Sequence, residues 1–311
     1  MTLQSTSPAQ EVIERLNADG FAVVEGLLDE ATVADLRGRV DRILAREREE
    51  AFASDETSEP NGDDYERLAY IWDTSDHEKS LWTNRIREYR AQEFDTPWPV
   101  PDDEVCISFV HIPTFFDRGR SQRIFNLINK DTAFAPLLEH PRVLEIMDRE
   151  LGRDSVLLDV SVNHVGPGTD SGGWHVDSPI SQMPAPFPEF TLGIQTVWML
   201  DDFSADNGAT HVVRGSHETL QQPPSGRSEI ENEAVLEGPA GSLALWLSQT
   251  WHRHGANVTD SPRCGVVVQY GRSWVKPFVD LRSPMTADQA AELSPRLRYM
   301  MGCNANAPVR G

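Results

Sequence analysis

The sequence predicts an α+β chain in which a mainly helical N-terminal region packs against a jelly-roll core. Before residue 155, apolar residues recur at helical spacing in several segments. From Ser155 onward, short apolar runs alternate with turns rich in Gly, Pro and Asn, as in a β-sandwich or barrel. No linker divides the 311 residues, so we expect a single domain spanning 1–311, with a region of about 10–150 packed on a core of about 155–279.

The helical segments follow from apolar spacing and end signals. Val12, Ile13 and Leu16 line one face of a first helix, which Asp19-Gly20 ends. Asp29 is a suitable N-cap for a second, longer helix. We therefore predict helices at about 11–19, 30–50, 132–151 and 286–301.

The strands are predicted from short apolar runs bounded by turn residues. Two long loops, 182–188 and 218–234, would surround the open mouth of the jelly roll and act as lids. The predicted strands lie near 21–24, 106–111, 123–128, 156–165, 173–178, 191–200, 209–213, 242–247, 250–254 and 264–271.

Composition excludes several classes of function. The formal net charge of −21 argues against binding to nucleic acid or to an anionic membrane surface. Three Cys without a C-x-x-C pair indicate neither a disulfide framework nor a structural zinc site. The N-terminus lacks a signal-peptide pattern, and no apolar run reaches the roughly 18–20 residues of a membrane span. We expect a cytoplasmic protein; its oligomeric state cannot be read from the sequence.

The motif Gly172-Gly-Trp-His-Val-Asp-Ser-Pro179 is the first candidate for chemistry. Side chains alternate between the faces of a strand, so His175 and Asp177 project from the same face. An imidazole and a carboxylate from one strand, completed by a second His, form the facial triad that binds Fe(II) and leaves coordination positions open. Alone, the pair also fits a polar surface turn, so the prediction depends on a partner His downstream.

That partner is found in segment 249–263. His252 follows the apolar run 242–247 and precedes a turn rich in Gly, Asn, Asp and Pro, as expected of a ligand from a distant strand. Arg263, eleven residues later, opens the next apolar run and would return beside the metal. A guanidinium there can bind the far end of a dicarboxylic cosubstrate through two parallel hydrogen bonds.

Together these motifs resemble the phytanoyl-CoA dioxygenase family of Fe(II)/2-oxoglutarate-dependent oxygenases. The resemblance is carried by four stretches: 17–29, 174–179, 198–217 and 252–263. It implies a double-stranded β-helix, a jelly-roll or cupin-like core, flanked by N-terminal and peripheral helices. It also implies Fe(II), the cosubstrates 2-oxoglutarate and O₂, and a small-molecule substrate.

The resemblance assigns roles by position. His175, Asp177 and His252 match the iron ligands that form the catalytic centre. Arg263 matches the residue that pairs with the C5 carboxylate of 2-oxoglutarate. The presence of Asp177 argues against halogenation, which needs a small residue at this position so that halide can bind.

Four further residues are cosubstrate candidates. Asn163, on the strand before the metal motif, resembles a polar residue that relatives use on 2-oxoglutarate, and Asn126 and Gln195 are weaker matches. His254 departs from the pattern, because several relatives carry a small hydroxyl residue there. If it shares a face with His252, it could contact the cosubstrate or the substrate, or compete as a ligand.

The implied reaction is hydroxylation of an unactivated C–H bond, with decarboxylation of 2-oxoglutarate to succinate and CO₂. The same iron site could instead catalyse desaturation, epoxidation or rearrangement. Two alternatives lie outside this chemistry: a non-catalytic jelly-roll binding protein, and a zinc hydrolase using both His ligands and His254.

Candidate substrate contacts come from an aromatic-rich region, 65–100, and from the loop 113–120. We select Trp72, Phe116, Arg118 and Arg120. The two Arg would favour an acidic group on the substrate, whereas the simpler interpretation is that they are solvated loop charges.

Overall fold

A computed structural model of the chain describes residues 8–52, 114–116, 120–226, 229–277, 279–282 and 284–303. Its helices are α1 (Pro8–Asp19), α2 (Glu30–Phe52), α5 (Leu127–Lys130), α6 (Ala135–Leu138), α7 (Pro141–Glu150), α8 (Ala287–Glu292) and α9 (Pro295–Met300). Its strands are β1 (Phe21–Val24), β2 (Thr114–Phe116), β3 (Ser121–Ile124), β4 (Val156–Val165), β5 (Gly193–Met199), β6 (Thr210–Val213), β7 (Glu233–Val235), β8 (Leu243–Leu247), β9 (His252–His254) and β10 (Arg263–Gly271).

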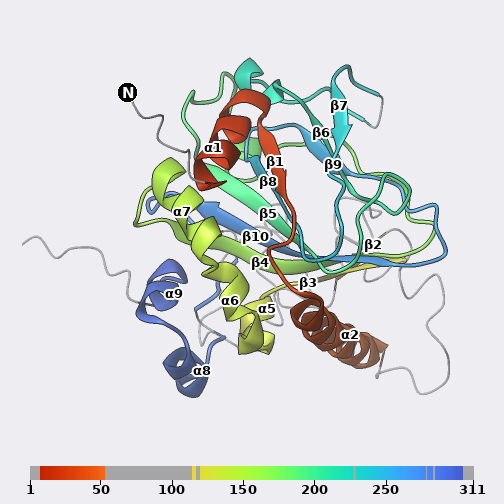
Figure 1. Ribbon diagram of the computed structural model, residues 1–311, viewed down its shortest axis with the longest axis vertical. Coiled ribbons are helices and arrows are strands. Elements are labelled where there is room, and N and C mark those ends of the chain that lie inside the picture. The colour runs from red at the N-terminus through yellow and green to blue at the C-terminus, as the bar shows by residue number, and fades with distance from the viewer. Residues whose placement is uncertain are drawn as a thin grey trace, which may run out of the picture.

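The strands form two antiparallel sheets. The larger sheet has the order β1-β8-β5-β10-β4-β3-β2, and the smaller has the order β7-β6-β9 (Figure 1). From β1 to β4 the neighbours in the larger sheet are not consecutive in sequence, as crossovers between the two layers of a jelly roll require, whereas β4, β3 and β2 are consecutive strands. The α+β class with a jelly-roll core is confirmed, and the larger sheet does not close on itself.

Alternation along β10 separates the two faces of the larger sheet. Cys264, Val266 and Val268 pack in the cluster formed with the helices, and we call this the outer face. Val267 packs instead with Val212 of β6 and with other residues next to the smaller sheet, and we call this the inner face. Side chains at every second position of β10 therefore point into the space between the sheets.

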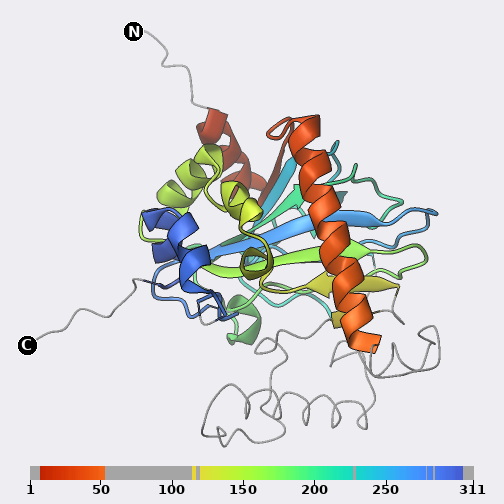
Figure 2. The same ribbon diagram turned by 90° about the horizontal axis from the view of Figure 1, so that it is seen from below.

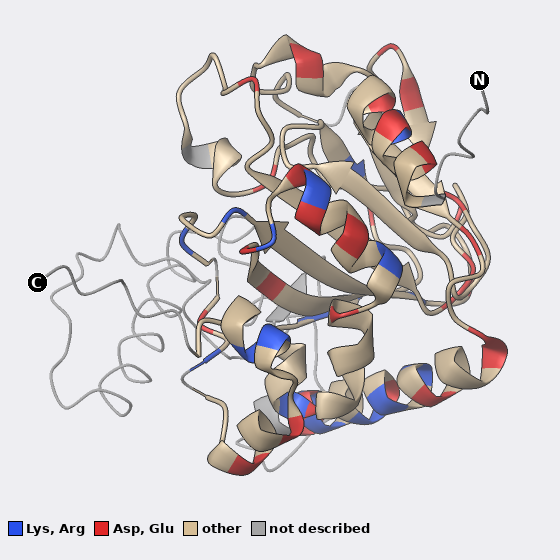
Figure 3. Ribbon diagram, turned by 60° about the vertical axis from the view of Figure 1, so that its left-hand side comes forward, with Lys and Arg blue, Asp and Glu red and all other residues tan. Residues whose placement is uncertain are grey.

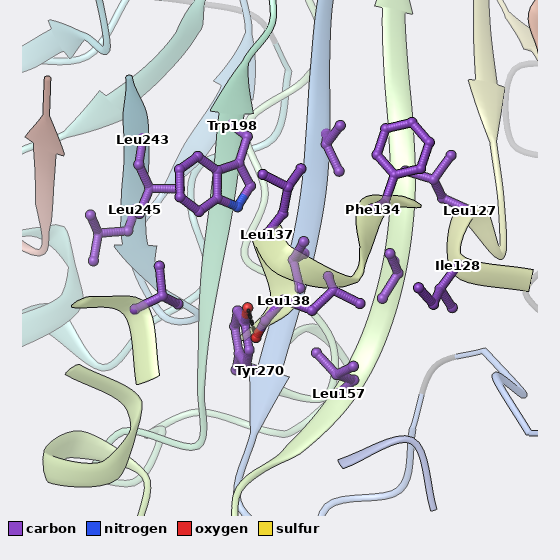
Figure 4. Packing of buried hydrophobic residues seen from close by; sticks show 14 of the residues in the cluster. Leu127, Ile128, Phe134, Leu137, Leu138, Leu157, Trp198, Leu243, Leu245 and Tyr270 are labelled. Atoms are coloured by element: carbon purple, nitrogen blue, oxygen red, sulfur yellow. Dashed lines mark hydrogen bonds between the residues drawn. The ribbon is translucent and has the colours of Figure 1, made fainter. Parts of the chain in front are cut away.

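The outer face carries the main core. Helices α1, α2, α6 and α7 gather over it, with α2 running across the strands (Figures 1 and 2). Trp198 and Tyr270 are fully buried there, and the Tyr270 hydroxyl donates a 3.1 Å hydrogen bond to the Leu138 carbonyl (Figure 4). This bond ties α6 to β10 at a depth where an unpaired hydroxyl would be costly.

Helix α2 is a surface helix that is stabilised by an N-cap and by charge pairs. The predicted N-cap is confirmed, because Asp29 Oδ1 accepts a 2.8 Å hydrogen bond from the Thr32 amide. Its exposed side mixes Arg with Asp and Glu (Figure 3), and Arg39 pairs with Asp35 one turn away. Arg37 Nε lies 3.2 Å from Asp201, which anchors the helix to the sheet beyond β5.

The predicted helix over 132–151 is wrong in its continuity. It is divided into a 3₁₀ turn (Thr132–Phe134), α6 and α7, with Pro136 and Pro141 in the first turns of α6 and α7. The predicted strand 123–128 ends at Ile124, because Asn126 adopts a left-handed conformation and α5 begins at once.

Other boundaries differ as well. The predicted strand 173–178 is an extended segment with a single isolated bridge at His175. The predicted helix 286–301 is divided into α8 and α9, because Ser294 caps a new helix that begins with a Pro. The loop 218–234 overlaps a short strand, β7, and the predicted strand 106–111 lies outside the described residues. In the part of the chain described, no helix is long and apolar enough to cross a membrane.

The outer-face core gives a stability prediction. Leu245 is fully buried on β8, so Leu245→Ala should lower the free energy of unfolding by about 2–5 kcal/mol through lost burial and a residual cavity. Val258→Ala is the matched control, because Val258 is 74% exposed and should change the value by less than about 0.5 kcal/mol. Urea denaturation measures both; equal midpoints for the two variants would contradict this view of the core.

Candidate metal centre

Two segments far apart in sequence place the candidate ligands side by side. His175 and His252 form an isolated antiparallel bridge, in which each backbone N–H donates to the other's carbonyl at 3.0 Å. The Asp177 amide donates to the Ser248 carbonyl at 3.0 Å, so the motif stays registered along the approach to β9. Gly172 allows this pairing, because a Cβ there would lie 2.7 Å from the His254 ring.

The three predicted ligands converge. One ligand atom each of His175, Asp177 and His252 lie within 4.8 Å of one another, a spacing that could hold a metal ion. His252 Nε2 is 3.4 Å from Asp177 Oδ1, and the two imidazole rings are 4.2 Å apart between centroids. Two imidazoles and one carboxylate are the donor set of the facial triad.

Backbone carbonyls orient both imidazoles. His175 Nδ1 donates to the Gly173 carbonyl and His252 Nδ1 donates to the Thr250 carbonyl, each at 2.9 Å. A carbonyl oxygen only accepts, so in the neutral ring each Nδ1 carries the proton and each Nε2 presents a lone pair to a metal. The local backbone of each segment thus selects the ligating nitrogen.

Asp177 receives support from a residue that the sequence did not single out. Trp246 on β8 donates its indole N–H to Asp177 Oδ2 at 3.2 Å, and its ring lies 5.0 Å from the His252 ring. This bond holds one carboxylate oxygen and directs Oδ1 toward His252. The only sequence signal was an indole on the alternate face of an apolar run, and its partner could not be known before the fold.

The charges of the centre suit a cation. His175 is an exposed residue, yet the atoms packed around its imidazole, together with nearby His252, lower its pKa to about 4. Burial alone would raise the pKa of Asp177, but His252, His175 and the indole lower it below its usual value. Burial would lower the pKa of His252, yet the Asp177 carboxylate raises it. At neutral pH the centre therefore offers the Asp177 carboxylate and the neutral imidazole of His175. The Asp177 carboxylate also lies next to the His252 imidazole.

A second set of contacts joins the ligand segments on the side away from the metal. Trp174 and Arg253 each adjoin a ligand in sequence, and the Arg253 guanidinium lies 4.3 Å from the centroid of the Trp174 ring. Arg253 is itself held by Glu233 of β7 at 2.8 Å, and Glu233 also contacts His211. Because neighbouring side chains alternate in direction, these contacts stabilise the bridge without entering the centre.

Arg263, the predicted cosubstrate residue, is a buried guanidinium at the start of β10. It is 3% exposed, stacks 4.4 Å from the Phe203 ring centroid, and forms no ion pair within the described part of the chain. Its Nε likewise has no hydrogen-bond partner there. Burial lowers the pKa of Arg263 to about 10, so the guanidinium stays charged at neutral pH and fits an anionic ligand.

Two of the other cosubstrate candidates share its face. Asn163 lies opposite Gly265, and Gln195 lies opposite Gln269; both partners are at alternate positions of β10 from Arg263. Residues directly opposite each other share a face, so all three predicted side chains are on the inner face.

Asn126 and His254 are engaged elsewhere. Asn126 donates to the Asp280 carbonyl at 3.2 Å at the start of α5. His254 Nε2 lies 3.1 Å from the Asp170 carbonyl, with its ring over Gly172, and His254 does not belong to the ligand group. Their predicted roles toward 2-oxoglutarate stay predictions.

Among the predicted substrate contacts, the structure describes the side chain of Arg120 alone. Trp72 and Arg118 lie outside the described residues, and for Phe116 only the backbone in β2 is described. Arg120 is exposed, and its backbone carbonyl lies against Gly166, where a Cβ would be 1.9 Å away.

The support of Asp177 by an indole can be tested directly. Trp246→Phe removes that hydrogen bond and should weaken Fe(II) binding about 10-fold, as for other groups that orient metal ligands. Trp251→Phe is a matched control, because Trp251 also donates its indole N–H, but to the Gln221 carbonyl. Anaerobic competition titration with a chelating indicator gives both affinities; equal weakening in the two variants would refute the assignment.

Comparison with known proteins agrees with this geometry. The chain is 26% identical over 182 residues to the protein named dioxygenase af480 of Aspergillus fumigatus, which covers 58% of each chain. It is 25% identical over 309 residues to the uncharacterized protein Rv1501 of Mycobacterium tuberculosis, covering 96% of this chain and 89% of that one. The chain thus spans just over half the length of the first relative and most of the second.

Solved structures show the same fold at low identity. The carbocyclase SnoK from nogalamycin biosynthesis has a TM-score of 0.53 and 15% identity, covering 99% of this chain and 97% of its own. The epimerase SnoN from that biosynthesis, solved with Fe³⁺, α-ketoglutarate and nogalamycin RO, has a TM-score of 0.50 and 16% identity, covering 87% and 86%. The sequence profile of one family, phytanoyl-CoA dioxygenase (PhyH), matches residues 16–265, and this protein therefore belongs to that family.

Proposed function

We propose that this protein is an Fe(II)- and 2-oxoglutarate-dependent dioxygenase that hydroxylates an unactivated C–H bond of a small organic molecule. The observation that carries the proposal is the convergence of His175, Asp177 and His252, with both Nδ1 atoms bound to carbonyls. Family membership and the dioxygenase names of relatives support it.

The donor set fits Fe(II). When bound, iron with 2-oxoglutarate and O₂ supplies an oxidant for C–H bonds, and the balanced reaction is R–H + 2-oxoglutarate + O₂ → R–OH + succinate + CO₂. The chain's own contribution is to hold three ligands on one side, so that other coordination positions stay open. Trp246 and the two backbone carbonyls fix the directions of those ligands.

Arg263 would hold the C5 carboxylate of 2-oxoglutarate. A buried guanidinium without an ion pair in the described chain is poorly solvated, so a carboxylate that reaches it restores the lost interactions. Asn163 and Gln195, on the same face, would contact the cosubstrate between Arg263 and the metal. Exclusion of water around this pair strengthens the interaction and fixes the cosubstrate's orientation.

The fate of the oxidised substrate depends on its position relative to the metal. The two structural neighbours named above are an epimerase and a carbocyclase, so rearrangement from the same kind of centre is the second candidate outcome. Mass spectrometry of the product distinguishes them, because hydroxylation adds one oxygen atom, whereas epimerisation leaves the mass unchanged.

The first test is an anaerobic titration of the apo protein with Fe(II) and then 2-oxoglutarate. A weak visible charge-transfer band should appear only after both additions. Arg263→Gln should raise the apparent Kd of 2-oxoglutarate about 10- to 150-fold, since hydrogen bonds to charged groups contribute about 1.5–3 kcal/mol. Fe(II) affinity should stay within twofold of wild type.

Arg149→Gln is the matched control, because Arg149 forms an exposed ion pair with Glu145 on α7 and should leave the band unaltered. A folded, iron-loaded protein that gives no band would overturn the proposal. Turnover of a substrate without O₂ or 2-oxoglutarate would favour a zinc hydrolase, and metabolite binding without any turnover would favour a binding protein.

A further inference from the structure

A row of polar side chains crosses the inner face of the larger sheet from the candidate metal centre. Trp246 of β8 lies opposite Gln195 of β5, which lies opposite Gln269 of β10, which lies opposite Asp159 of β4. Directly opposite residues share a face, so the row is continuous. Trp246 contacts Asp177, and three strand spacings of about 4.8 Å place the Asp159 backbone about 14 Å farther across the sheet.

Asp159 is a buried carboxylate with one oxygen occupied. It is 1% exposed, and its Oδ2 accepts hydrogen bonds from Arg123 Nη2 at 2.8 Å and from the Ser161 hydroxyl at 2.7 Å. Its Oδ1 is also buried and has no hydrogen-bond partner among the described residues. Buried acceptors are nearly always satisfied, so this oxygen points to a ligand that donates a hydrogen bond.

The charge of the Asp159–Arg123 pair indicates which chemical group of a ligand donates to Asp159. The Arg123 guanidinium already balances the Asp159 carboxylate, so the pair is neutral overall. A substrate carboxylate would face the lone pairs of Oδ1 and be repelled, and a hydrocarbon or ether would leave this oxygen unsatisfied. An alcohol hydroxyl donates one hydrogen bond without adding charge.

We propose that Asp159 Oδ1 accepts a hydrogen bond from an alcohol hydroxyl already present on the substrate. The substrate is then a hydroxyl-bearing carbon skeleton, bound with its hydroxyl at β4 and its reacting C–H bond toward the metal. Arg123 and Ser161 are positioning residues, because they hold Oδ2 and so direct Oδ1. This inference rests on the proposed dioxygenase function.

The test uses the anaerobic Fe(II)·2-oxoglutarate protein and three probes on one rigid four-ring skeleton that is long enough to extend from Asp159 toward the metal: 5α-androstan-3β-ol, its methyl ether, and 5α-androstane-3β-carboxylate. Each probe is titrated while the visible band is followed. The alcohol should perturb the band at a concentration at least 10-fold lower than either of the others. In Asp159→Asn this preference should fall below threefold, while the Kd of 2-oxoglutarate stays within twofold of wild type.

Asp148→Asn is the matched control, because Asp148 is also paired with an Arg, Arg296, but lies on α7 in the helical layer, and it should keep the alcohol preference. If Asp159→Asn fails to fold, the relative affinities of the three probes for the wild-type protein still test the inference. Equal or tighter binding of the ether or carboxylate, or no response to any probe while the band is present, overturns the inference. Absence of the band itself removes the proposed function, which is a separate and distinguishable result.

Discussion

The pair of backbone hydrogen bonds between His175 and His252 is the constraint on which the site depends. The bridge is flanked by bonds from the Gly172 amide to the His254 carbonyl and from the Asp177 amide to the Ser248 carbonyl, and together they set how close the two imidazoles lie. Once the bridge is formed, alternation sends the ligands to one side and the Trp174–Arg253 stack to the other. The metal centre and its packing support are thus opposite faces of the same two segments.

The inner face is chemically unlike the outer one. On the outer face of β10, Val266, Val268 and Tyr270 meet helices in an apolar cluster. On the inner face the same strand presents Arg263 and Gln269, whose burial is tolerable only with partners. Gln269 donates to the Ser178 carbonyl at 2.6 Å, beside Asp177, so one strand connects the cosubstrate end of the site with the metal motif. A strand with two such different faces serves both as core and as the wall of a site.

The sequence predicted the convergence of His175, Asp177 and His252, because the signals of these residues are local. The His-x-Asp spacing and the interval from His252 to Arg263 are short, and the strand pattern around them is strong. Helix continuity over 132–151 was mispredicted because apolar periodicity persists across two prolines that start new helices. The contacts of Trp246 and Asp159 could not be predicted, because each depends on the pairing of strands that are distant in the chain.

The pairing of β1 with β8 has a consequence for how the protein is made. Ala22 lies opposite Leu245, and the Gly20 carbonyl accepts hydrogen bonds from Leu247 and Thr250, just before His252. About 220 residues separate the two strands, which at about 5–20 residues per second is roughly 10–45 s of translation. Through that interval β1 is an unpaired edge that can associate with other chains. The metal centre can therefore form only after the chain has been synthesised through His252, because that residue completes the bridge to His175.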